Sequence, residues 1–259
     1  MDNTSCNKIR YSPTVSIITV TYNAAEDLEK TIQSVIEQTY KNIEFIIIDG
    51  NSSDQTRWII EKFSEGIDKI VSEPDNGIYD AMNKGISLAS GKYLHFLNAG
   101  DYFCNENSLE LLLESAGCEY DVIYGDIMLV QVDGRERHHK AMEFTLSNLM
   151  KFGTGVLCHQ AMLVSRDIAS LYAVKYTYKG ELNWYFDIFE NKKEVSFFHH
   201  DEPFVYYFLG GIGHKNFIRN RIEWYTVLLR RFGLNSVINS QFIKFIYNDF
   251  RNRYVLSKR

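Results

Sequence analysis

The sequence predicts an α/β fold in which a Rossmann-like, doubly wound and mostly parallel central sheet is followed by a C-terminal helical extension. From Val15 onward, short apolar runs alternate with segments of helical periodicity, which is typical of parallel strands joined by right-handed crossovers. Polar residues and carboxylates follow the ends of these apolar runs. The last part of the chain carries basic amphipathic patterns instead, which indicates helices appended to the sheet.

The first strand and helix are predicted from local signals. Residues 15–20 form a short β-branched run bounded by Pro13 and Asn23, which favours a strand. Residues 24–38 follow with the spacing of an amphipathic helix. The apolar stripe of that helix comprises Leu28, Ile32, Val35 and Ile36.

The alternation continues to residue 97. It predicts strands at residues 43–48, 67–72 and 92–97, and helices at residues 55–63 and 79–89. Because the carboxyl ends of parallel strands meet at one edge, Tyr22 and Asn23, residues 49–54 and residues 98–101 should converge there, as in a nucleotide crevice. Neither a P-loop nor a dinucleotide fingerprint follows the first strand, so phosphates would be bound through a metal ion, with Asp101 as its ligand.

Composition is that of an ordinary globular protein, with 259 residues, 45% hydrophobic and 24% charged. No apolar run approaches the ~18 residues of a membrane span, and the polar residues 1–11 lack the apolar core of a signal peptide. We therefore expect a cytoplasmic protein. The four cysteines are widely spaced, which favours reduced thiols over a zinc site or a disulfide framework.

The formal charge of −5 conceals an asymmetry between the two parts of the chain. From Lys215 to the end, ten basic residues stand against Glu223 and Asp249, which leaves about −13 for residues 1–214. The sequence thus describes an acidic body with a basic end.

Several stretches match motifs of one enzyme family: VSIITVTYN at 15–23, SVIEQTY at 34–40, IIIDGNSSD at 46–54, GIYDAMNKG at 77–85 and the run 96–101. The sequence resembles the family 2 glycosyltransferases of the GT-A fold, inverting enzymes that take a sugar from a nucleotide diphosphate. Later landmarks resemble a bacterial polysaccharide-assembly branch: Tyr124-Gly125-Asp126, His159-Gln160 and Gly210-Gly211. The resemblance covers roughly residues 13–235.

The resemblance implies a donor site at the strand ends. Tyr22 and Asn23 would lie beside the base, and Asp49 would hydrogen-bond its uracil-like edge, while Asp54 either supports the same loop or caps a helix. The donor-binding residues it implies are Thr21, Tyr22, Asn23, Asp49, Asn51, Asp54, Asp80, Asn83 and Gly100.

Two positions depart from the family pattern. Met82 stands where many members carry an arginine that contacts phosphate, and Lys84 is a substitute candidate. Gly100 stands where a second acid is common, so Asp101 alone would hold Mn²⁺ or Mg²⁺ together with the diphosphate oxygens. His214 is a further ligand candidate, with a surface histidine as the alternative.

Inverting transfer requires a base for the proton of the acceptor hydroxyl. By the resemblance this base is an acid that opens a helix well after the metal motif, and Glu181 follows Gly180, which would allow a turn, at such a place. Asp187 is the competitor. His159 would contact the acceptor or the diphosphate, or else be a hydrogen-bonded core residue.

Other polar residues have weaker predictions. Asp126, at the end of a strand predicted over residues 122–124, would bind acceptor hydroxyls or cap a turn. The pairs His138-His139 and His199-His200 do not suggest metal clamps, because neighbours in a strand point to opposite faces.

The basic end has two readings. Residues 219–231 and 237–254 interleave aromatic and apolar residues with arginine and lysine, as in helices that lie on an anionic membrane interface. The alternative is a helical pair that packs on the catalytic domain or on a second subunit of a homo-oligomer. Nucleic acid is disfavoured as a partner by the acidic body.

These predictions give a domain plan and a function. The plan is an N-terminal tail at 1–12, a GT-A catalytic domain at 13–214, divided into a nucleotide-binding half at 13–103 and an acceptor half at 104–214, and an extension at 215–259. The expected enzyme is a hexosyl- or N-acetylhexosaminyltransferase that moves a sugar, from UDP by preference, to a lipid-linked oligosaccharide or polysaccharide, peripheral on the inner face of the plasma membrane. The alternatives are a non-catalytic sugar-nucleotide-binding or scaffold relative and a nucleotidyltransferase, although the latter lacks its glycine- and arginine-rich loop here.

Overall fold

The computed structural model describes residues 12–209 and 216–240 of the chain. A 9-stranded sheet forms the centre of this part. Its strands are β1 Val15–Thr21, β2 Ile43–Asp49, β3 Lys69–Ser72, β4 Tyr93–Phe96, β5 Tyr102–Phe103, β6 Val122–Val130, β7 Glu136–His139, β8 Met162–Ser165 and β9 Phe197–Phe208. The strand order is β3-β2-β1-β4-β8-β6-β9-β5, with β7 paired to β6.

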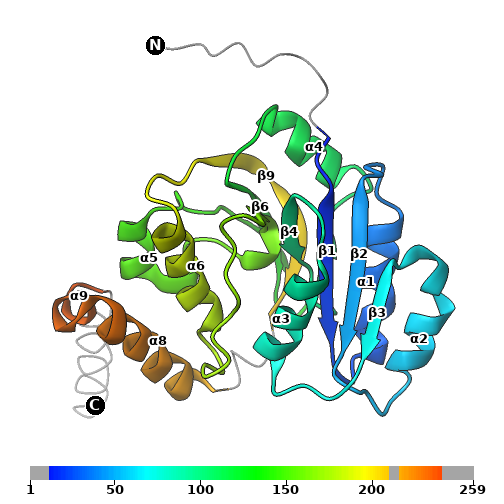
Figure 1. Cartoon of the computed structure of the whole chain (residues 1–259), viewed down its shortest axis with the longest axis horizontal. Coiled ribbons are helices and arrows are strands. Elements are labelled where there is room, and N and C mark those ends of the chain that lie inside the picture. Colours follow the sequence, from blue (N-terminus) through cyan, green and yellow to red (C-terminus); the bar gives the residue numbers. More distant parts are fainter. Residues whose placement is uncertain (1–11, 210–215, 241–259) are drawn as a thin grey trace.

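Helices cover both faces of this sheet (Figure 1). They are α1 Ala25–Ile36, α2 Thr56–Lys62, α3 Ile78–Leu88, α4 Ser108–Ala116, α5 Leu146–Phe152, α6 Gly180–Asn191, α8 Phe217–Phe232 and α9 Leu234–Asn239. Each helix and strand expected up to residue 97 is present, with ends that differ by one to a few residues from the prediction.

The alternation of side chains along β1 creates two separate cores. Ile18 and Val20 face a core that includes residues of α3, α5, α6 and α8, whereas Val15 and Ile17 face a core with α1, α2 and α4. Every residue of β1 is buried, because helices lie on both of its faces. The predicted α/β fold with a central sheet and a C-terminal helical part is confirmed.

The pairing changes from parallel to mixed in the second half. β1 pairs in parallel with β2 and with β4, and β2 pairs in parallel with β3. β8 then lies antiparallel between β4 and β6, while β9 runs parallel to β6 and antiparallel to β5. The strand expected to end at Tyr124 continues to Val130, because β7 and β9 supply hydrogen-bonding partners on both sides of it.

Helix α8, the first helix after β9, packs on α6 (Figure 1). Val227 and Leu228 are fully buried in the core that α6 also lines, and the rings of Phe186 and Phe232 meet edge to face at 4.8 Å. Packing on the catalytic domain, one of the two readings of the basic end, thus accounts for one face of α8. Among the helices of the described residues, none has both the length and the apolar character needed to cross a bilayer.

Candidate active site

The register of the sheet brings the predicted strand ends together. Thr21 pairs with Asp49, and Asp49 pairs with Ser72, so β1, β2 and β3 end side by side. The backbone N–H of Ala99 donates to the carbonyl of Val20 at 3.4 Å, which places the 98–101 run next to the end of β1. The convergence expected from the alternating pattern is therefore present.

Asp49 lies at the bottom of the donor edge. Its carboxylate is buried and accepts hydrogen bonds from the hydroxyls of Ser52 and Ser72 and from the backbone N–H of Ser52. Asn51 adopts a left-handed backbone conformation, with φ at 63°, that turns the chain back over this carboxylate. The loop after β2 is therefore organised around Asp49.

A second set of bonds ties this loop to the end of β1. Asn23, also left-handed with φ at 48°, accepts from the backbone N–H of Ser53 at 2.9 Å. Asp54 accepts from the backbone N–H groups of Thr56 and Ala25, at the starts of α2 and α1. Hydrogen bonds from the Thr56 hydroxyl and backbone lower the pKa of Asp54. Asp54 thus joins the loop to the first residues of both helices, although it is not the N-cap residue of either.

Tyr22 is the exposed aromatic residue of this edge, with 65% of its surface accessible. Its ring passes Gly50 so closely that a Cβ there would lie 3.3 Å from the ring and 2.5 Å from the Asp75 carboxylate. A side chain at position 50 would therefore require the Asp75 carboxylate and the Tyr22 ring to shift. The free face of Tyr22 is suited to stack on a flat ring.

Helix α3 directs its polar residues to neighbouring segments. The Asn83 amide makes two bonds with the backbone of Tyr172, donating to its carbonyl at 2.9 Å and accepting from its N–H at 2.7 Å. Asp80 accepts from the backbone N–H of Asn76 at 2.9 Å. Lys84, the substitute candidate for a phosphate contact, pairs with Glu73 at 2.9 Å. In this structure all three side chains hold loops in place.

Asp101 sits just behind the strand ends and is 6% exposed. One carboxylate oxygen accepts from the backbone N–H of Phe208 on β9 at 2.8 Å. Burial raises the pKa of Asp101 from 3.8 to about 7, against the opposing hydrogen bonds from Phe208 and Gln160. Gly100 precedes it with φ at 103°, a conformation that a residue with a side chain rarely adopts, so the glycine that replaces the second acid also suits the backbone.

A divalent ion fits this site only when a bound phosphate supplies further oxygen ligands. Within residues 12–209 and 216–240, no group of three or more histidine, cysteine or acidic side chains is placed to hold a metal. Two buried oxygens at the same strand ends, Thr21 Oγ1 and Asn98 Oδ1, have no hydrogen-bond partner. One carboxylate and neutral oxygens suit Mg²⁺ or Mn²⁺ when phosphate supplies the remaining ligands. His214 and the Gly210-Gly211 landmark lie outside the described residues.

Glu181 and His159 form a partly buried pair beside this edge. The Nδ1 atom of His159 lies 3.2 Å from a Glu181 carboxylate oxygen, and the two side chains are 11% and 23% exposed. Burial acts to raise the pKa of Glu181, but the hydrogen bond and charge of His159, together with the charge of Lys179, hold that pKa below its usual value. Glu181 is therefore ionised at neutral pH and can accept a proton.

Several unpartnered polar atoms accompany this pair. His159 Nε2 and the hydroxyls of Tyr172 and Tyr185 are buried without a hydrogen-bond partner in the described part of the chain. The charge of Glu181 contributes to the raised pKa of both tyrosines, second to their burial. Buried polar atoms without partners are rare in folded proteins, and a group of them is expected where a polar ligand binds.

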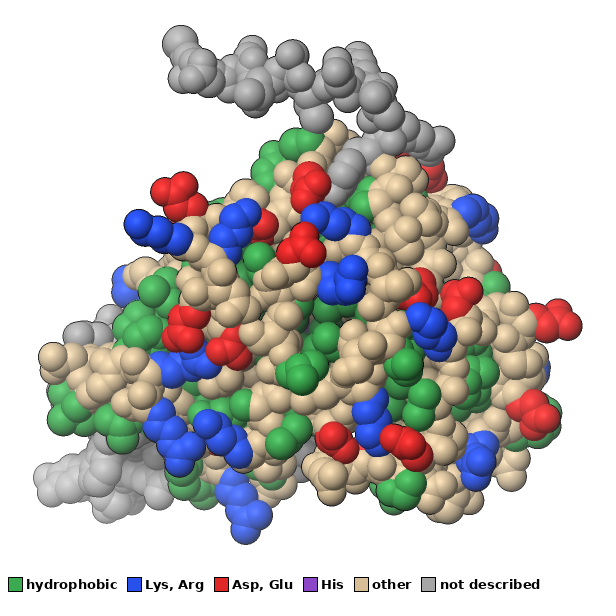
Figure 2. Space-filling model, viewed as in Figure 1, with side chains coloured by type: hydrophobic (Ala, Val, Ile, Leu, Met, Phe, Trp, Pro, Cys, Tyr) green, Lys and Arg blue, Asp and Glu red, His purple; other side chains and the backbone are tan. Residues whose placement is uncertain are grey.

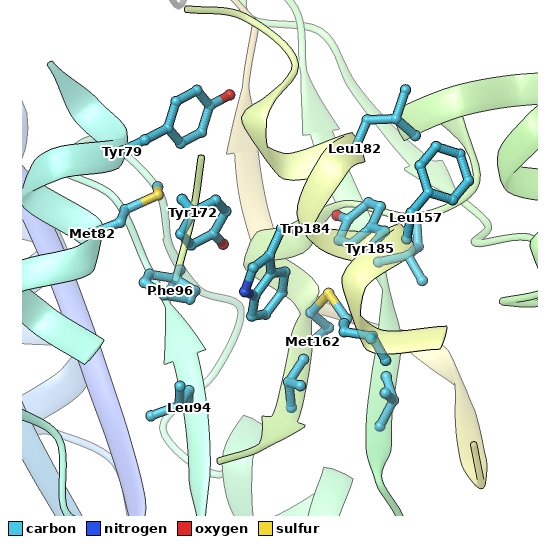
Figure 3. Close-up of a cluster of buried hydrophobic side chains, with 14 of the residues drawn as sticks. Tyr79, Met82, Leu94, Phe96, Leu157, Met162, Tyr172, Leu182, Trp184 and Tyr185 are labelled. Carbon is cyan, nitrogen blue, oxygen red and sulfur yellow. The ribbon is translucent and has the colours of Figure 1, made fainter. Parts of the chain in front are cut away.

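A stack of aromatic rings fixes the position of α6 (Figure 3). Tyr79 of α3 stacks on Tyr172 at 5.4 Å, and Tyr172 stacks on Trp184 of α6 at 4.9 Å. Phe96 of β4 meets both Tyr172 and Trp184 edge to face. The stack connects the helix that carries Glu181 to the strand that leads to Asp101.

Gly180 opens α6, as expected, but for a different reason than a turn. Its φ is not positive, and a Cβ at this position would lie 2.6 Å from the Tyr79 ring. The glycine is thus needed for the close approach of α6 to α3. Asp187, the competing base, lies further along α6, where it pairs with Arg231 and accepts a hydrogen bond from the Asn183 side chain at 3.1 Å.

Asp126 is placed differently from the prediction. It lies inside β6, fully buried, and accepts from Nε2 of His138 at 2.6 Å and Nε2 of His199 at 2.7 Å. The prediction that it ends a strand is wrong, because the strand pairs on both sides beyond Tyr124. One histidine of each adjacent pair therefore binds this carboxylate.

Gln160 and Lys179 are site residues to which the sequence assigned no role. Gln160 accepts from the backbone N–H of Asn98 at 3.0 Å and hydrogen-bonds Asp101. Lys179 is buried beside Glu181, and its ammonium group donates to Thr154 at 3.0 Å. Gln160 belongs to the His159-Gln160 landmark, so the sequence did mark its position. No local pattern marks Lys179, because it becomes buried only when distant segments pack.

Known proteins resemble this chain in sequence and in fold. The family described as "Glycosyl transferase family 2" matches residues 16–172. An uncharacterized glycosyltransferase of Mycobacterium tuberculosis is 35% identical over 153 residues, which span 58% of this chain and 58% of the relative. A PGL/p-HBAD biosynthesis glycosyltransferase of Mycobacterium bovis is 30% identical over 88% of this chain and 89% of its own length. The putative teichuronic acid biosynthesis glycosyltransferase TuaG of Bacillus subtilis is 37% identical over 40% of this chain and 44% of its own length.

Two solved structures share the fold at low sequence identity. TarS of Staphylococcus aureus in complex with UDP has a TM-score of 0.61 and 18% identity, covering 83% of this chain and 65% of that one. The mannosyltransferase PcManGT of Pyrobaculum calidifontis, in complex with GDP-Man and Mn²⁺, has a TM-score of 0.61 and 15% identity, covering 85% and 65%. The family match covers more than half of the chain, and it agrees with the motif residues at the strand ends and with the fold of these solved structures. The chain therefore belongs to the family 2 glycosyltransferases and has the GT-A fold.

Proposed function

We propose that this chain transfers a sugar from a nucleotide-diphosphate sugar to a lipid-linked glycan, with inversion at the anomeric carbon. The observation that carries the proposal is the Glu181–His159 pair at 3.2 Å, which opens α6 beside the donor edge. The names of the relatives support an envelope glycan or glycolipid as product, since they refer to PGL/p-HBAD and teichuronic acid biosynthesis. The solved neighbours bind UDP, UDP-GlcNAc or GDP-Man, which supports a nucleotide-sugar donor, hexosyl or N-acetylhexosaminyl.

In this proposal the strand ends bind the donor. Tyr22 stacks on the base, and Asp49 accepts from a ring N–H after exchanging one of its serine donors. The loop that Asn23, Asn51 and Asp54 organise places the nucleoside. Asp80, Asn83, Thr21 and Gly100 complete the proposed donor-binding set, in which Asn83 acts through Tyr172.

Glu181 is proposed as the general base. The acceptor hydroxyl gives its proton to the Glu181 carboxylate, and its oxygen forms a bond to the anomeric carbon of the donor. The bond from that carbon to the diphosphate oxygen breaks at the same time, and its electron pair leaves with the nucleoside diphosphate. His159 donates to Glu181 and so keeps the carboxylate ionised and oriented between turnovers.

Asp101 is the residue proposed to hold a divalent ion, Mn²⁺ or Mg²⁺, together with the donor diphosphate. The ion supplies positive charge that stabilises the departing diphosphate. Asn98 and Thr21, whose side-chain oxygens have no partner among the described residues, lie at the same strand ends. We further propose that the enzyme works at the cytoplasmic face of the membrane, where α8 contacts the surface.

Replacing Glu181 by glutamine tests the proposed base. Glu181→Gln keeps the size of the side chain and its contact with His159 but removes the proton acceptor, so turnover should fall by about 10² to 10⁴. Calorimetric binding of the nucleotide sugar should be unchanged. Glu190→Gln, on the same helix but 61% exposed, is the matched control and should keep full turnover. Normal turnover in Glu181→Gln would assign the base to another residue.

A further inference from the structure

A basic pocket lies between α8 and the segment that leads into α6. It has a volume of about 340 Å³ and is lined by residues 175–178 on one side and by α8 on the other. Three of its lining residues are cations, namely Lys175, Arg219 and Arg230, and all three are exposed to solvent. In Figure 2, Lys and Arg side chains gather over the part of the surface that α8 forms.

The lining of this pocket carries more positive than negative charge, with three cations against one acid, Glu223. None of the three cations forms an ion pair with any residue in the parts of the chain that the structure describes. Glu223 is the acid in the lining, and its carboxylate accepts from three consecutive backbone N–H groups, those of residues 177–179. The neighbouring Arg231 differs from these cations, because it forms ion pairs with both Asp187 and Glu190.

The pocket is directly connected to the proposed catalytic base. Residues 175–178 line it, and the chain then enters α6 at Gly180 and reaches Glu181. The bonds from Glu223 fix this segment to α8. A group bound in the pocket would therefore sit at a fixed place relative to the carboxylate that takes the acceptor proton.

An apolar line runs along α8 beside the cations. Ile218, Ile222 and Leu229 are spaced by four and seven residues, so they lie on one side of the helix, and they are 73%, 60% and 50% exposed. Arg219 and Arg230 each follow one residue later, so the basic line runs next to the apolar line. The surface thus offers cations and an adjoining apolar strip to the same ligand.

We propose that this pocket binds the phosphate group of the lipid-linked acceptor, a phosphate or diphosphate carried on a long apolar chain. The inference rests on the proposed function, since it names the part of the acceptor that α8 recognises. Arginine and lysine are the side chains that bind phosphate oxygens, and three of them line this pocket. The apolar strip would receive the first carbons of the lipid, and the sugar end would extend toward Glu181.

The test compares charge-matched variants on vesicles. The pocket variant is Arg219→Gln with Arg230→Gln, and the control is Arg57→Gln with Arg135→Gln, which removes two exposed arginines from other elements. Binding is measured to phosphatidylcholine vesicles that carry polyprenyl phosphate, and to vesicles that carry phosphatidylglycerol at equal surface charge. Wild type and control should prefer polyprenyl phosphate, soluble pyrophosphate should compete, and the pocket variant should bind polyprenyl phosphate about tenfold more weakly.

Three results would overturn the proposal. The first is that wild type binds both kinds of vesicle equally, or binds neither. The second is that pyrophosphate does not compete. The third is that the pocket variant and the control lose equal amounts of binding to polyprenyl phosphate vesicles. Equal binding to both kinds would identify a general membrane-surface contact instead. Nucleotide-sugar binding without acceptor is measured for every variant and should not change, because the pocket lies outside the donor edge. Absence of that binding in the wild type would instead contradict the proposed function.

Discussion

At the scale of single residues, His159 controls the proton affinity of the proposed base. Burial alone would raise the pKa of Glu181, and the contact with His159 at 3.2 Å, together with the charge of Lys179, reverses that direction. A base must be ionised to accept a proton, so the rate falls when the pH drops below its pKa. The histidine therefore extends the working range of Glu181 toward acid pH.

Removing this histidine should move the acid limb of the pH–rate profile. In His159→Ala the burial of Glu181 is no longer opposed by His159, so its pKa rises and the limb shifts to higher pH. Turnover at acid pH should therefore fall, and it should recover in part as the pH increases. The control is His139→Ala on β7, which leaves the pair intact. An acid limb that does not move in His159→Ala would contradict the assignment.

Asp101 should make the metal-free protein less stable as the pH rises. The folded chain keeps the proton on this carboxyl up to about pH 7, whereas the unfolded chain loses it near 3.8. Between these values the folded state binds more protons, so the free energy of unfolding decreases with pH, by up to ~4 kcal/mol. Above about 7 this contribution is constant.

Urea unfolding with chelator, repeated across this pH range, checks the contribution of Asp101. The difference in unfolding free energy between Asp101→Asn and wild type should move in favour of the variant as the pH rises, because asparagine does not ionise. Binding of Mn²⁺ with nucleotide to the wild type should strengthen over the same range, since the ion requires the ionised carboxylate. Parallel stability curves for the two proteins would show that Asp101 is not buried as described.

At the scale of elements, α8 acts as a support for the start of α6. Glu223 accepts from the backbone N–H groups of residues 177–179, the three residues that lead into α6. At the other end of the contact, Arg231 binds Asp187 and Glu190 of α6. The helix that carries Glu181 is thus held at both of its ends.

Loss of the Glu223 carboxylate should loosen this support. Glu223→Ala leaves three backbone N–H groups without their acceptor, which should cost roughly 1–3 kcal/mol of stability and lower turnover severalfold. Hydrogen exchange at residues 177–179 should become faster, which measures the local effect directly. Glu190→Ala removes only an exposed partner of Arg231 and should cost less than ~1 kcal/mol. Unchanged exchange at these amides in Glu223→Ala would contradict a supporting role.

At the scale of the whole molecule, the first half was predictable because its signals are local. The β-branched runs and the single apolar stripe of α1 specify parallel strands with helices between them, and the edge at Tyr22, Asp49 and Asp101 follows. The second half depends on contacts between distant segments. Asp126 becomes a buried partner of His138 and His199 only through the pairing of β6 with β7 and β9, which no local pattern specifies.

The same contrast explains which site residues the sequence identified. Glu181 was proposed from the sequence because an acid follows a glycine there, at the place where the family resemblance implies the base, and the structure places it in the first turn of α6. Lys179, Tyr172 and Gln160 were not assigned because their roles arise from packing: a buried ammonium group, a stacked ring and a bond to a neighbouring loop. The need for glycine at position 180 likewise arises from packing, because a Cβ there would lie 2.6 Å from the Tyr79 ring.

The last prediction concerns whether the catalytic domain is complete without α8. Val227 and Leu228 are fully buried in the core shared with α6, and each contributes about 1.5–3 kcal/mol when removed from water. Asp187 and the N–H groups of residues 177–179 find their partners on the same helix.

A chain that ends at Asn216 exposes this apolar surface and leaves these groups unpaired, so it should unfold at lower temperature and lose transfer activity. A chain that ends at Ser240 keeps all of these contacts and serves as the control. Thermal unfolding followed by circular dichroism distinguishes the two, and an unchanged midpoint in the shorter chain would show that residues 13–214 fold independently of α8.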